Sequence, residues 1–294
     1  MRYALFLGCT VPVRAMNYEL SARKVAEVLG IEFIDMEDAL CCGFPVKSIN
    51  REASIIMAAR NLALAEKQGL NICTLCSACT SVLTEVNKVL IEDEELREII
   101  NKKMGDIAYN GKVEVKHFSR ILYEDFGVDR LKTFVERPLE GIKLAAHYGC
   151  HYLKPSEIYD GFDDPEQPKS LDLLIELTGA ESVMYQGRGD CCGGAILGVE
   201  EEIALKMTKK KLDHVKAVGA DAMISICPFC SVMYEGNQKK IEKEFDTKYG
   251  LPVLYYPQLL GLALGISPDE LGFKLNRVKA KGLLAKLNGE KVSA

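Results

Sequence analysis

Residues 3–9 (YALFLGC) and residues 144–150 (LAAHYGC) are both apolar runs of strand length that end in Gly-Cys. In each half of the chain an adjacent pair of cysteines follows, and a Cys-x-x-Cys comes after the pair. The pairs are Cys41 and Cys42, then Cys191 and Cys192; the Cys-x-x-Cys segments are ICTLCSACTSVL and MISICPFCSVMY. Because the order single, pair, Cys-x-x-Cys occurs twice in 294 residues, we infer a tandem duplication.

The spacing of the cysteines supports the duplication. The two pairs are 150 residues apart, and the two Cys-x-x-Cys segments are 151 apart when Cys76 is matched with Cys227 and Cys79 with Cys230. An insertion around FDDPEQPKS accounts for the shorter distance between Cys9 and Cys150. Cys73 aligns with Ile224 and has no cysteine counterpart, so we interpret it as a buried strand residue.

Short apolar runs alternate with helical patterns in both halves. The predicted strands of the first half are RYALFLG, EFIDM, NICTL and VEVKHF; those of the second are IKLAAHY, SVMYQ, AMISI and PVLYY. Helical patterns between them, such as residues 51–69 and 81–103, favour an α/β fold with mostly parallel sheets flanked by helices. We expect two tandem, pseudo-symmetric, doubly wound (Rossmann-like) units, over residues 1–138 and 139–294, joined near VERPLEG.

Composition narrows the class of protein. The chain is 48% hydrophobic with a formal net charge of −5, which gives no reason to expect nucleic acid or an anionic membrane as a partner. No apolar run is long enough to span a membrane, and only eight residues precede Cys9 in LFLGC, too few for a signal peptide. We therefore expect a cytoplasmic protein whose eleven cysteines are reduced or bound to metal.

In such units the first cysteine, the pair and the Cys-x-x-Cys all follow strands, so five thiols per half gather at one carboxyl edge. Five cysteines with an adjacent pair fit a four-ligand zinc site poorly, and a thioredoxin-like pair leaves three thiols unexplained. All-cysteine ligation favours iron–sulfur chemistry, although an ordinary cubane needs only four thiolates. Zinc, and packing with catalytic thiols, remain open on spacing alone.

The spacing also resembles a known family. Gaps of 31 and 33 residues in the first half and of 40 and 34 in the second, around Cys-Cys-Gly, resemble the cysteine-rich CCG domain. Two tandem copies, with no ferredoxin or flavin segment, resemble the B subunit of heterodisulfide reductase from methanogenic archaea. CTLCSAC offers two choices of Cys-x-x-Cys, and the internal alignment favours Cys76 and Cys79.

The resemblance implies two non-cubane 4Fe–4S clusters that face one cavity and reduce the coenzyme M–coenzyme B heterodisulfide to two thiols. The implied metal ligands are Cys9, Cys41, Cys42, Cys76, Cys79, Cys150, Cys191, Cys192, Cys227 and Cys230. It also implies electron delivery by the flavin-containing and the ferredoxin-like subunits of heterodisulfide reductase, with a hydrogenase or formate dehydrogenase, since this chain has no segment for flavin or NAD. The alternative is a CCG-type electron-transfer subunit of a quinone-, fumarate- or hydroxy-acid-linked oxidoreductase.

Other residues near the cysteines are candidates for supporting roles. His151 follows Cys150 and is a candidate catalytic residue, whereas His147 belongs to a strand and fits the core. His117 ends the last strand of the first half and can approach the same edge. The run KMTKKKLDHVK fits the solvated side of a helix. Gly43, Gly193 and Gly194 would let the backbone pass close to a cluster.

The implied substrate is anionic, because coenzyme M carries a sulfonate and coenzyme B a phosphate and a carboxylate. We therefore expect cationic side chains in the loops that leave the same edge. The candidates are Arg14, Lys47, Lys154 and Arg188. A dinucleotide site is disfavoured, because Cys192 stands where GRGDCCG would need its third glycine.

Overall fold

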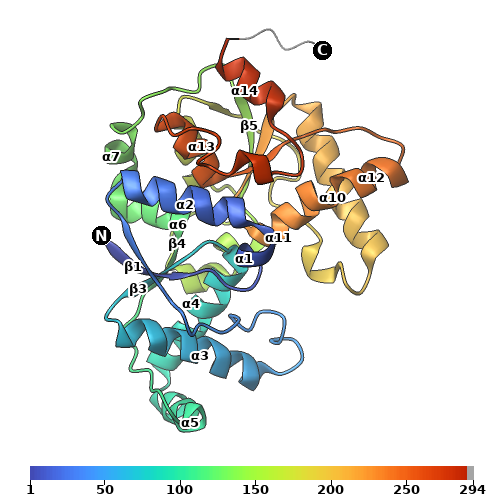
Figure 1. Cartoon of the computed structure of the whole chain (residues 1–294). Helices are drawn as coiled ribbons and strands as arrows, with labels where there is room; N and C mark the ends of the chain where they lie inside the picture. Colours follow the sequence, from blue (N-terminus) through green and yellow to red (C-terminus); the bar gives the residue numbers. More distant parts are fainter. Residues whose placement is uncertain (290–294) are drawn as a thin grey trace.

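The computed structural model describes residues 1–289 and contains two four-stranded sheets of identical topology (Figure 1). The first sheet has the order β2-β1-β3-β4 and the second the order β6-β5-β7-β8, with every neighbouring pair parallel. The strands are β1 (Arg2–Phe6), β2 (Glu32–Asp35), β3 (Asn71–Thr74), β4 (Val115–His117), β5 (Lys143–His147), β6 (Glu181–Ser182), β7 (Ala222–Ser225) and β8 (Val253–Tyr255). The central strands are buried, as expected for parallel sheets covered on both faces.

Helices connect successive strands. In the first half they are α1 (Val11–Arg14), α2 (Met16–Val28), α3 (Arg51–Lys67), α4 (Ser77–Glu92), α5 (Glu94–Met104), α6 (Phe118–Arg120), the π-helix η1 (Ile121–Gly127) and α7 (Val128–Lys132). In the second half they are α8 (Cys150–Leu153), η2 (Ser156–Tyr159), α9 (Ser170–Glu176), η3 (Gly194–Ile196), α10 (Glu201–Ala217), α11 (Pro228–Ser231), η4 (Val232–Gly236), α12 (Gln238–Glu244), α13 (Tyr256–Ala263), η5 (Phe273–Leu275) and α14 (Lys281–Leu287).

The predicted fold class, two tandem doubly wound α/β units, is confirmed. The proposed boundary between residues 138 and 139 stays a prediction, and it falls in the loop between α7 and β5. Residues 290–294, the end of the second predicted unit, lie outside the described residues.

Two predicted elements differ from the structure. The helix expected over residues 81–103 is two helices, because Asp93 adopts an extended conformation and caps α5, its side chain accepting a hydrogen bond from Leu96 N at 2.9 Å. Of the strand expected at SVMYQ, only Ser182 is in a strand, the two-residue β6 at the sheet edge. After β6 the chain leaves the sheet. The Tyr185 side chain still contacts the sheet, because its Oη donates a hydrogen bond to Ala146 O at 2.9 Å.

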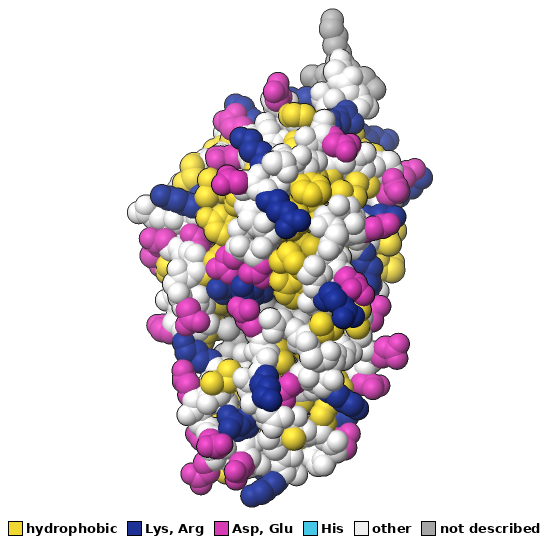
Figure 2. Space-filling model, turned by 90° about the vertical axis from the view of Figure 1, so that its left-hand side faces the viewer, with side chains coloured by type: hydrophobic (Ala, Val, Ile, Leu, Met, Phe, Trp, Pro, Cys, Tyr) yellow, Lys and Arg dark blue, Asp and Glu magenta, His cyan; other side chains and the backbone are white. Residues whose placement is uncertain are grey.

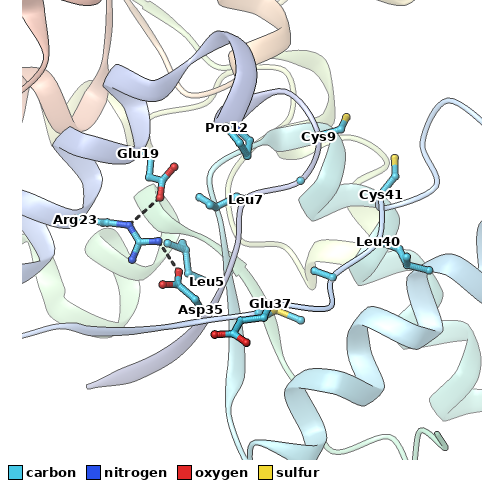
Figure 3. Close-up of a pocket in the computed structure, with 13 residues that line it drawn as sticks. Leu5, Leu7, Cys9, Pro12, Glu19, Arg23, Asp35, Glu37, Leu40 and Cys41 are labelled. Carbon is cyan, nitrogen blue, oxygen red and sulfur yellow. Dashed lines mark hydrogen bonds and ion pairs between the residues drawn. The ribbon is translucent and has the colours of Figure 1, made fainter. Parts of the chain in front are cut away.

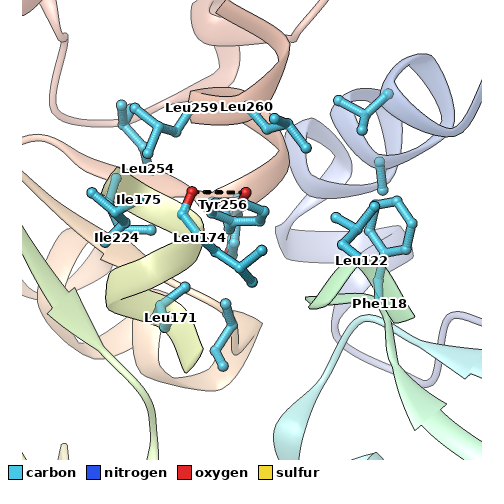
Figure 4. Packing of buried hydrophobic residues seen from close by; sticks show 14 of the residues in the cluster. Phe118, Leu122, Leu171, Leu174, Ile175, Ile224, Leu254, Tyr256, Leu259 and Leu260 are labelled. Atoms are coloured by element: carbon cyan, nitrogen blue, oxygen red, sulfur yellow. Dashed lines mark hydrogen bonds between the residues drawn. The ribbon is translucent and has the colours of Figure 1, made fainter. Parts of the chain in front are cut away.

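The two halves pack against each other through helices rather than through their sheets. Helix α2 of the first half lies beside α13 of the second (Figure 1). One hydrophobic cluster runs across this contact, with Phe118 and Leu122 on one side and Leu171, Tyr256 and Leu259 on the other (Figure 4). The Tyr256 hydroxyl is satisfied within it by Leu174 O at 2.9 Å. This shared core places the carboxyl edges of both sheets next to each other.

The surface shows mixed charge. On the face seen in Figure 2, lysine and arginine side chains alternate with aspartate and glutamate instead of gathering into a basic patch. Among the described residues, no helix has the length and apolar character to cross a bilayer.

Candidate metal centres

The sheet topology brings the cysteines of each half to one place. In the first half, β1 and β3 are neighbours, and the loops after them carry Cys9 and Cys76. The chain reverses its direction of winding between these two strands, which is the position where doubly wound sheets form a crevice at their carboxyl ends. In the second half, β5 and β7 are neighbours in the same way, and Cys150 and Cys227 follow them.

The Cys-x-x-Cys segments sit where a strand turns into a helix. Cys76 has an extended backbone and is the N-cap of α4, so Cys79 lies in the first turn of this 16-residue helix. Cys227 has nearly the same conformation and is the N-cap of α11. Hydrogen bonds from the thiols of Cys230 and Cys76 lower the pKa of Cys227, whereas hydrogen bonding to Cys42 and Cys76 raises the pKa of Cys79.

The loops with the cysteine pairs bend sharply at glycine. Gly43 and Gly193 have φ angles of +91° and +84°. A Cβ at Gly193 would lie 2.8 Å from the backbone oxygen of Ala204 in α10, so the loop passes too close to that helix for any side chain. The N–H groups of Gly193 and Gly194 donate to the sulfurs of Cys191 and Cys192, both at 3.4 Å.

Within each half the sulfurs interact with one another. Hydrogen bonds from the thiols of Cys41 and Cys79 hold the pKa of Cys42 well below that of a free cysteine. Hydrogen bonds from Cys150 and Cys192 lower the pKa of Cys191 in the same way. Each half therefore holds a cysteine pair in which one sulfur is stabilised as a thiolate, the form that binds metal.

The two sets of cysteines meet where the halves join. The Sγ atoms of Cys76 and Cys227, one from each half, are 3.9 Å apart in the buried interior. Cys9 and Cys41 lie at the outer side, where they line a cavity of about 550 Å³, and Figure 3 shows both side chains at the same end of it. Arg23 at the opposite end is held by Glu19 and Asp35 at 2.9 and 2.5 Å.

These residues fit an iron–sulfur cluster in each half. All ten predicted ligands lie beyond the carboxyl ends of the strands, in loops or in the first turns of helices, and six of them are buried. Among residues 1–289, no three His, Cys, Asp or Glu side chains are close enough to hold a single metal ion. Five cysteine sulfurs in each half suit a cluster of several iron atoms, because cysteine thiolates are the usual ligands of iron–sulfur clusters. The ligand assignment itself stays a prediction.

Cys73 lies in a different environment. It is the third residue of β3, paired in register with Leu5, and it is fully buried in the core between the two halves. Burial raises the pKa of its thiol, so it is held as a neutral group. It belongs to the strand, whereas Cys76 and Cys79 lie beyond the strand end.

His151 occupies the junction of the two halves. It lies in α8 directly after Cys150, and its ring packs edge-on against Phe44, which follows the first cysteine pair, at 4.9 Å between centroids. Its Nδ1 is buried with no hydrogen-bond partner among the described residues. Burial lowers the pKa of His151, so the imidazole is neutral at pH 7.

The four predicted anion-binding residues do not converge on one cavity. Lys154 and Arg188 line the same cavity of about 780 Å³ but are already paired, with Glu166 and Asp172 respectively. Lys47 pairs with Glu85. Arg14 forms no ion pair within the part of the chain described, and it lines a small pocket of about 110 Å³ beside Arg277. Their roles stay predictions.

The structure adds three residues to the site. A Cβ at Gly8 would lie 3.0 Å from Cys79 Sγ, and one at Gly149 would lie 3.7 Å from Cys230 Sγ. The repeated Gly-Cys dipeptide was the available signal for both. Lys211 belongs to the run that we expected on the solvated side of its helix, but that expectation was wrong, since Lys211 is only 2% exposed.

The repeated cysteine pattern on two parallel sheets matches a known class. The profile of the cysteine-rich domain (CCG) matches residues 3–84 and 144–235, and the chain belongs to this family. It is 37% identical over 292 residues to the B subunit of the ferredoxin/F(420)H(2)-dependent CoB-CoM heterodisulfide reductase of Methanosarcina acetivorans, with 97% of each chain covered. It is 34% identical to the "8-methylmenaquinol:fumarate reductase membrane anchor subunit" of Wolinella succinogenes, over 96% of this chain and 98% of that one.

A solved structure shares the fold. A hypothetical protein from Helicobacter pylori superposes with a TM-score of 0.77 at 18% identity, over 95% of this chain and 52% of that chain. Together, the family and its relatives identify this chain as an iron–sulfur subunit of an oxidoreductase, similar to the B subunit of heterodisulfide reductase.

Proposed function

We propose that this chain is the subunit that reduces the coenzyme M–coenzyme B heterodisulfide, with one non-cubane 4Fe–4S cluster on the five cysteines of each half. The observation that carries the proposal is the approach of Cys76 and Cys227 to 3.9 Å across the junction of the halves. With the two cysteine sets this close, a single disulfide at the junction is within reach of both sites. The 37% identity to a heterodisulfide reductase subunit over 97% of the chain supports it.

The reaction takes up two electrons and two protons as one S–S bond becomes two thiols. Clusters held by the five proposed cysteine ligands of each half would supply the electrons. The chain itself supplies the buried, water-poor junction and its proton donors. His151 is the candidate for proton delivery, because it follows Cys150 in α8, its ring packs on Phe44, and its Nδ1 is unpartnered among the described residues.

The substrate's anionic groups require positive charge at the mouth of the site. Lys154 and Arg188 share a cavity with Asp190, the residue before the second cysteine pair, and Arg14 is the last residue of α1, the helix that follows Cys9. Because Arg188 is held by Asp172, with side chains only 11% and 14% exposed, we assign direct contact with the anion to Arg14 or Lys154.

Electrons come from partner chains under this proposal. By resemblance these are the flavin-containing subunit and the ferredoxin-like subunit of heterodisulfide reductase, linked to a hydrogenase or formate dehydrogenase. We propose a cytoplasmic location for the complex.

A second candidate is supported by the Wolinella relative. Its name assigns it to a menaquinol:fumarate reductase, and it is almost as similar to this chain as the methanogen relative. In that case the same clusters would conduct electrons between a quinol and a separate catalytic chain.

The first prediction separates these candidates. The anaerobically purified chain should contain about eight iron atoms and negligible zinc, and its complex with the partner subunits should reduce the heterodisulfide with reduced viologen dye as donor. Stoichiometric zinc after anaerobic reconstitution would contradict the clusters. An iron-replete complex that oxidises the dye with fumarate or a quinone, but not with the heterodisulfide, would establish the second candidate.

A further inference from the structure

The two halves differ at two equivalent positions next to the cysteines. Phe6 and His147 both end the first strand of their half, three residues before Cys9 or Cys150, and each pairs in register with the last residue of the neighbouring strand. The second position lies 20 residues after the first cysteine of the adjacent pair, Cys41 or Cys191. It is Asn61 in α3 and Lys211 in α10. The second half therefore has an imidazole and a cation where the first half has a phenyl ring and a neutral amide.

Asn61 is a neutral side chain that hydrogen-bonds to the backbone of the loop with Cys41 and Cys42. It is fully buried, and its Oδ1 accepts from Leu40 N at 2.8 Å. Its Nδ2 donates to the carbonyls of Leu40 and Cys41 at 3.2 and 3.3 Å. The side chain thus fixes the backbone that carries Cys41 and Cys42 without adding charge.

Lys211 likewise hydrogen-bonds to the backbone next to Cys191 and Cys192, but its side chain is a cation. Its Nζ donates to Asp190 O at 2.5 Å and to Arg188 O at 3.0 Å, and Asp190 stands where Leu40 stands in the first half. Within residues 1–289 it forms no ion pair with a carboxylate, although it is 2% exposed. Burial lowers the pKa of Lys211 to about 8, and the nearby Cys230 opposes this shift, so the amine stays protonated at pH 7.

His147 connects this cation to the cysteines. Its Nδ1 lies 3.3 Å from Lys211 Nζ and accepts from it, so the proton of the neutral ring is on Nε2. Nε2 is buried without a partner among the described residues, and the ring lies close enough to Cys227 and Cys191 to interact with their charge. A buried N–H needs an acceptor. Phe6 offers no such donor in the first half.

We propose that Lys211 and His147 make the second site, on Cys150 to Cys230, the more easily reduced of the two. This inference depends on the clusters proposed above. A cluster gains negative charge when it is reduced, and a nearby buried cation together with an N–H donor stabilises that charge, which raises its potential. Electrons that enter the chain would therefore collect on the second half before the disulfide reacts.

The test is a redox titration of the anaerobic complex followed by electron paramagnetic resonance, with signals assigned to each half by Cys42→Ala and Cys192→Ala. Lys211→Gln keeps a donor for the loop carbonyls but removes the charge. At a fixed potential, the ratio of reduced to oxidised second cluster should fall about tenfold, which is about 59 mV for one electron. The first cluster should not change, and His147→Phe should shift the second cluster in the same direction.

Lys210→Gln is the matched control. It removes the same charge from the neighbouring position of α10, where the side chain is 65% exposed and 3.6 Å from Asp190, and it should change the ratio less than about twofold. If Lys211→Gln leaves the second cluster unshifted, or shifts both clusters equally, with iron content intact, the proposal is wrong.

If Lys211→Gln does not fold or does not hold iron, the Asn61→Lys variant tests the proposal instead. It should raise the potential of the first cluster, and an unchanged first cluster would overturn the proposal. Failure of the proposed function has a different signature, because the wild-type complex would then lack iron or lack heterodisulfide turnover regardless of these variants.

Discussion

At the scale of single residues, Cys73 and Cys79 have opposite environments although both lie three residues from Cys76. Cys73 is buried in the apolar core with its strand partner Leu5, and its thiol lies 4.0 Å from Thr74 O. Cys79 lies in the first turn of α4, where its thiol hydrogen-bonds with those of Cys42 and Cys76. The end of a strand therefore separates a packing residue from a candidate ligand.

The second prediction follows from this difference. Cys73→Ala should leave the iron content of the chain unchanged and cost about 1 kcal/mol of stability, since it removes one small buried group. Cys79→Ala should lower the iron content, because it removes a proposed ligand. Iron per chain after anaerobic purification is the measurement. Loss of iron in Cys73→Ala but not in Cys79→Ala would show that the ligands are Cys73 and Cys76.

At the scale of elements, the loops with the cysteine pairs depend on the helices that follow them. Gly193 approaches the backbone of α10 so closely that a Cβ would lie 2.8 Å from Ala204 O and 3.0 Å from Ala204 Cα. Thr208 of the same helix donates its hydroxyl to Cys192 O at 2.9 Å. In the first half, Ser54 of α3 donates to Gly43 O at 3.0 Å. Each helix thus fixes the position of the pair.

The third prediction uses two glycines with positive φ. Gly219 has a φ of +66° and open space around its Cα, so Gly219→Ala should cost only about 1 kcal/mol, from backbone strain. Gly193→Ala adds a collision with backbone and should cost at least about 2 kcal/mol more, because α10 cannot give way like a side chain. Denaturant unfolding gives the stabilities.

Iron content provides the second readout for this pair of variants. Gly193→Ala should also lose iron, since Cys191 and Cys192 move with the loop, while Gly219→Ala should retain it. Equal stability and equal iron content in the two variants would show that the close approach to α10 is unimportant.

At the scale of the whole molecule, a buried polar contact joins the halves next to the sites. His117, at the end of β4, has Nε2 2.8 Å from Ile226 O, and Ile226 precedes Cys227. Because Ser119 N donates to His117 Nδ1 at 3.1 Å, the ring is neutral with its proton on Nε2. Tyr18 Oη donates to the same carbonyl at 3.2 Å and stacks on Tyr255 at 4.0 Å between centroids. The junction is thus fixed by polar groups as well as by the shared core.

The fourth prediction concerns pH. Burial lowers the pKa of His117 to about 4, whereas an unfolded histidine titrates near 6.5. The unfolded state then binds the proton first, so stability is full above about pH 6.5 and falls as the pH drops toward 4. Between pH 7 and pH 5.5 this group should contribute a loss of about 1 kcal/mol.

His117→Gln removes this titration and keeps a donor for Ile226 O. The difference in unfolding free energy between the native chain and the variant should therefore shrink by about 1 kcal/mol from pH 7 to pH 5.5. A difference that does not depend on pH would mean that His117 is accessible to protons in the folded state.

The duplication, the two parallel α/β units and the carboxyl edge as the place of the cysteines could all be predicted from the sequence. These features depend on short stretches of sequence. The apolar runs predict the strands, and parallel strands have their carboxyl ends at the same edge of the sheet. Cys9 and Cys76, which follow two of these strands, must therefore lie at that edge. The internal match also placed Cys73 inside a strand, since Ile224 occupies that position in the second half.

How the halves meet, and which side chains are buried there, depends on contacts that the folded chain alone creates. The 3.9 Å approach of Cys76 to Cys227 depends on contacts between the halves, such as those of α2 with α13 and of α4 with α8, and no spacing within one half encodes them. The burial of Lys211 could not be read from a lysine-rich helix, because its neighbour Lys210 is exposed and the two differ only in which way they face. Ion pairs such as Arg188 with Asp172 join residues distant in the chain, so only folding reveals that these cations already have partners.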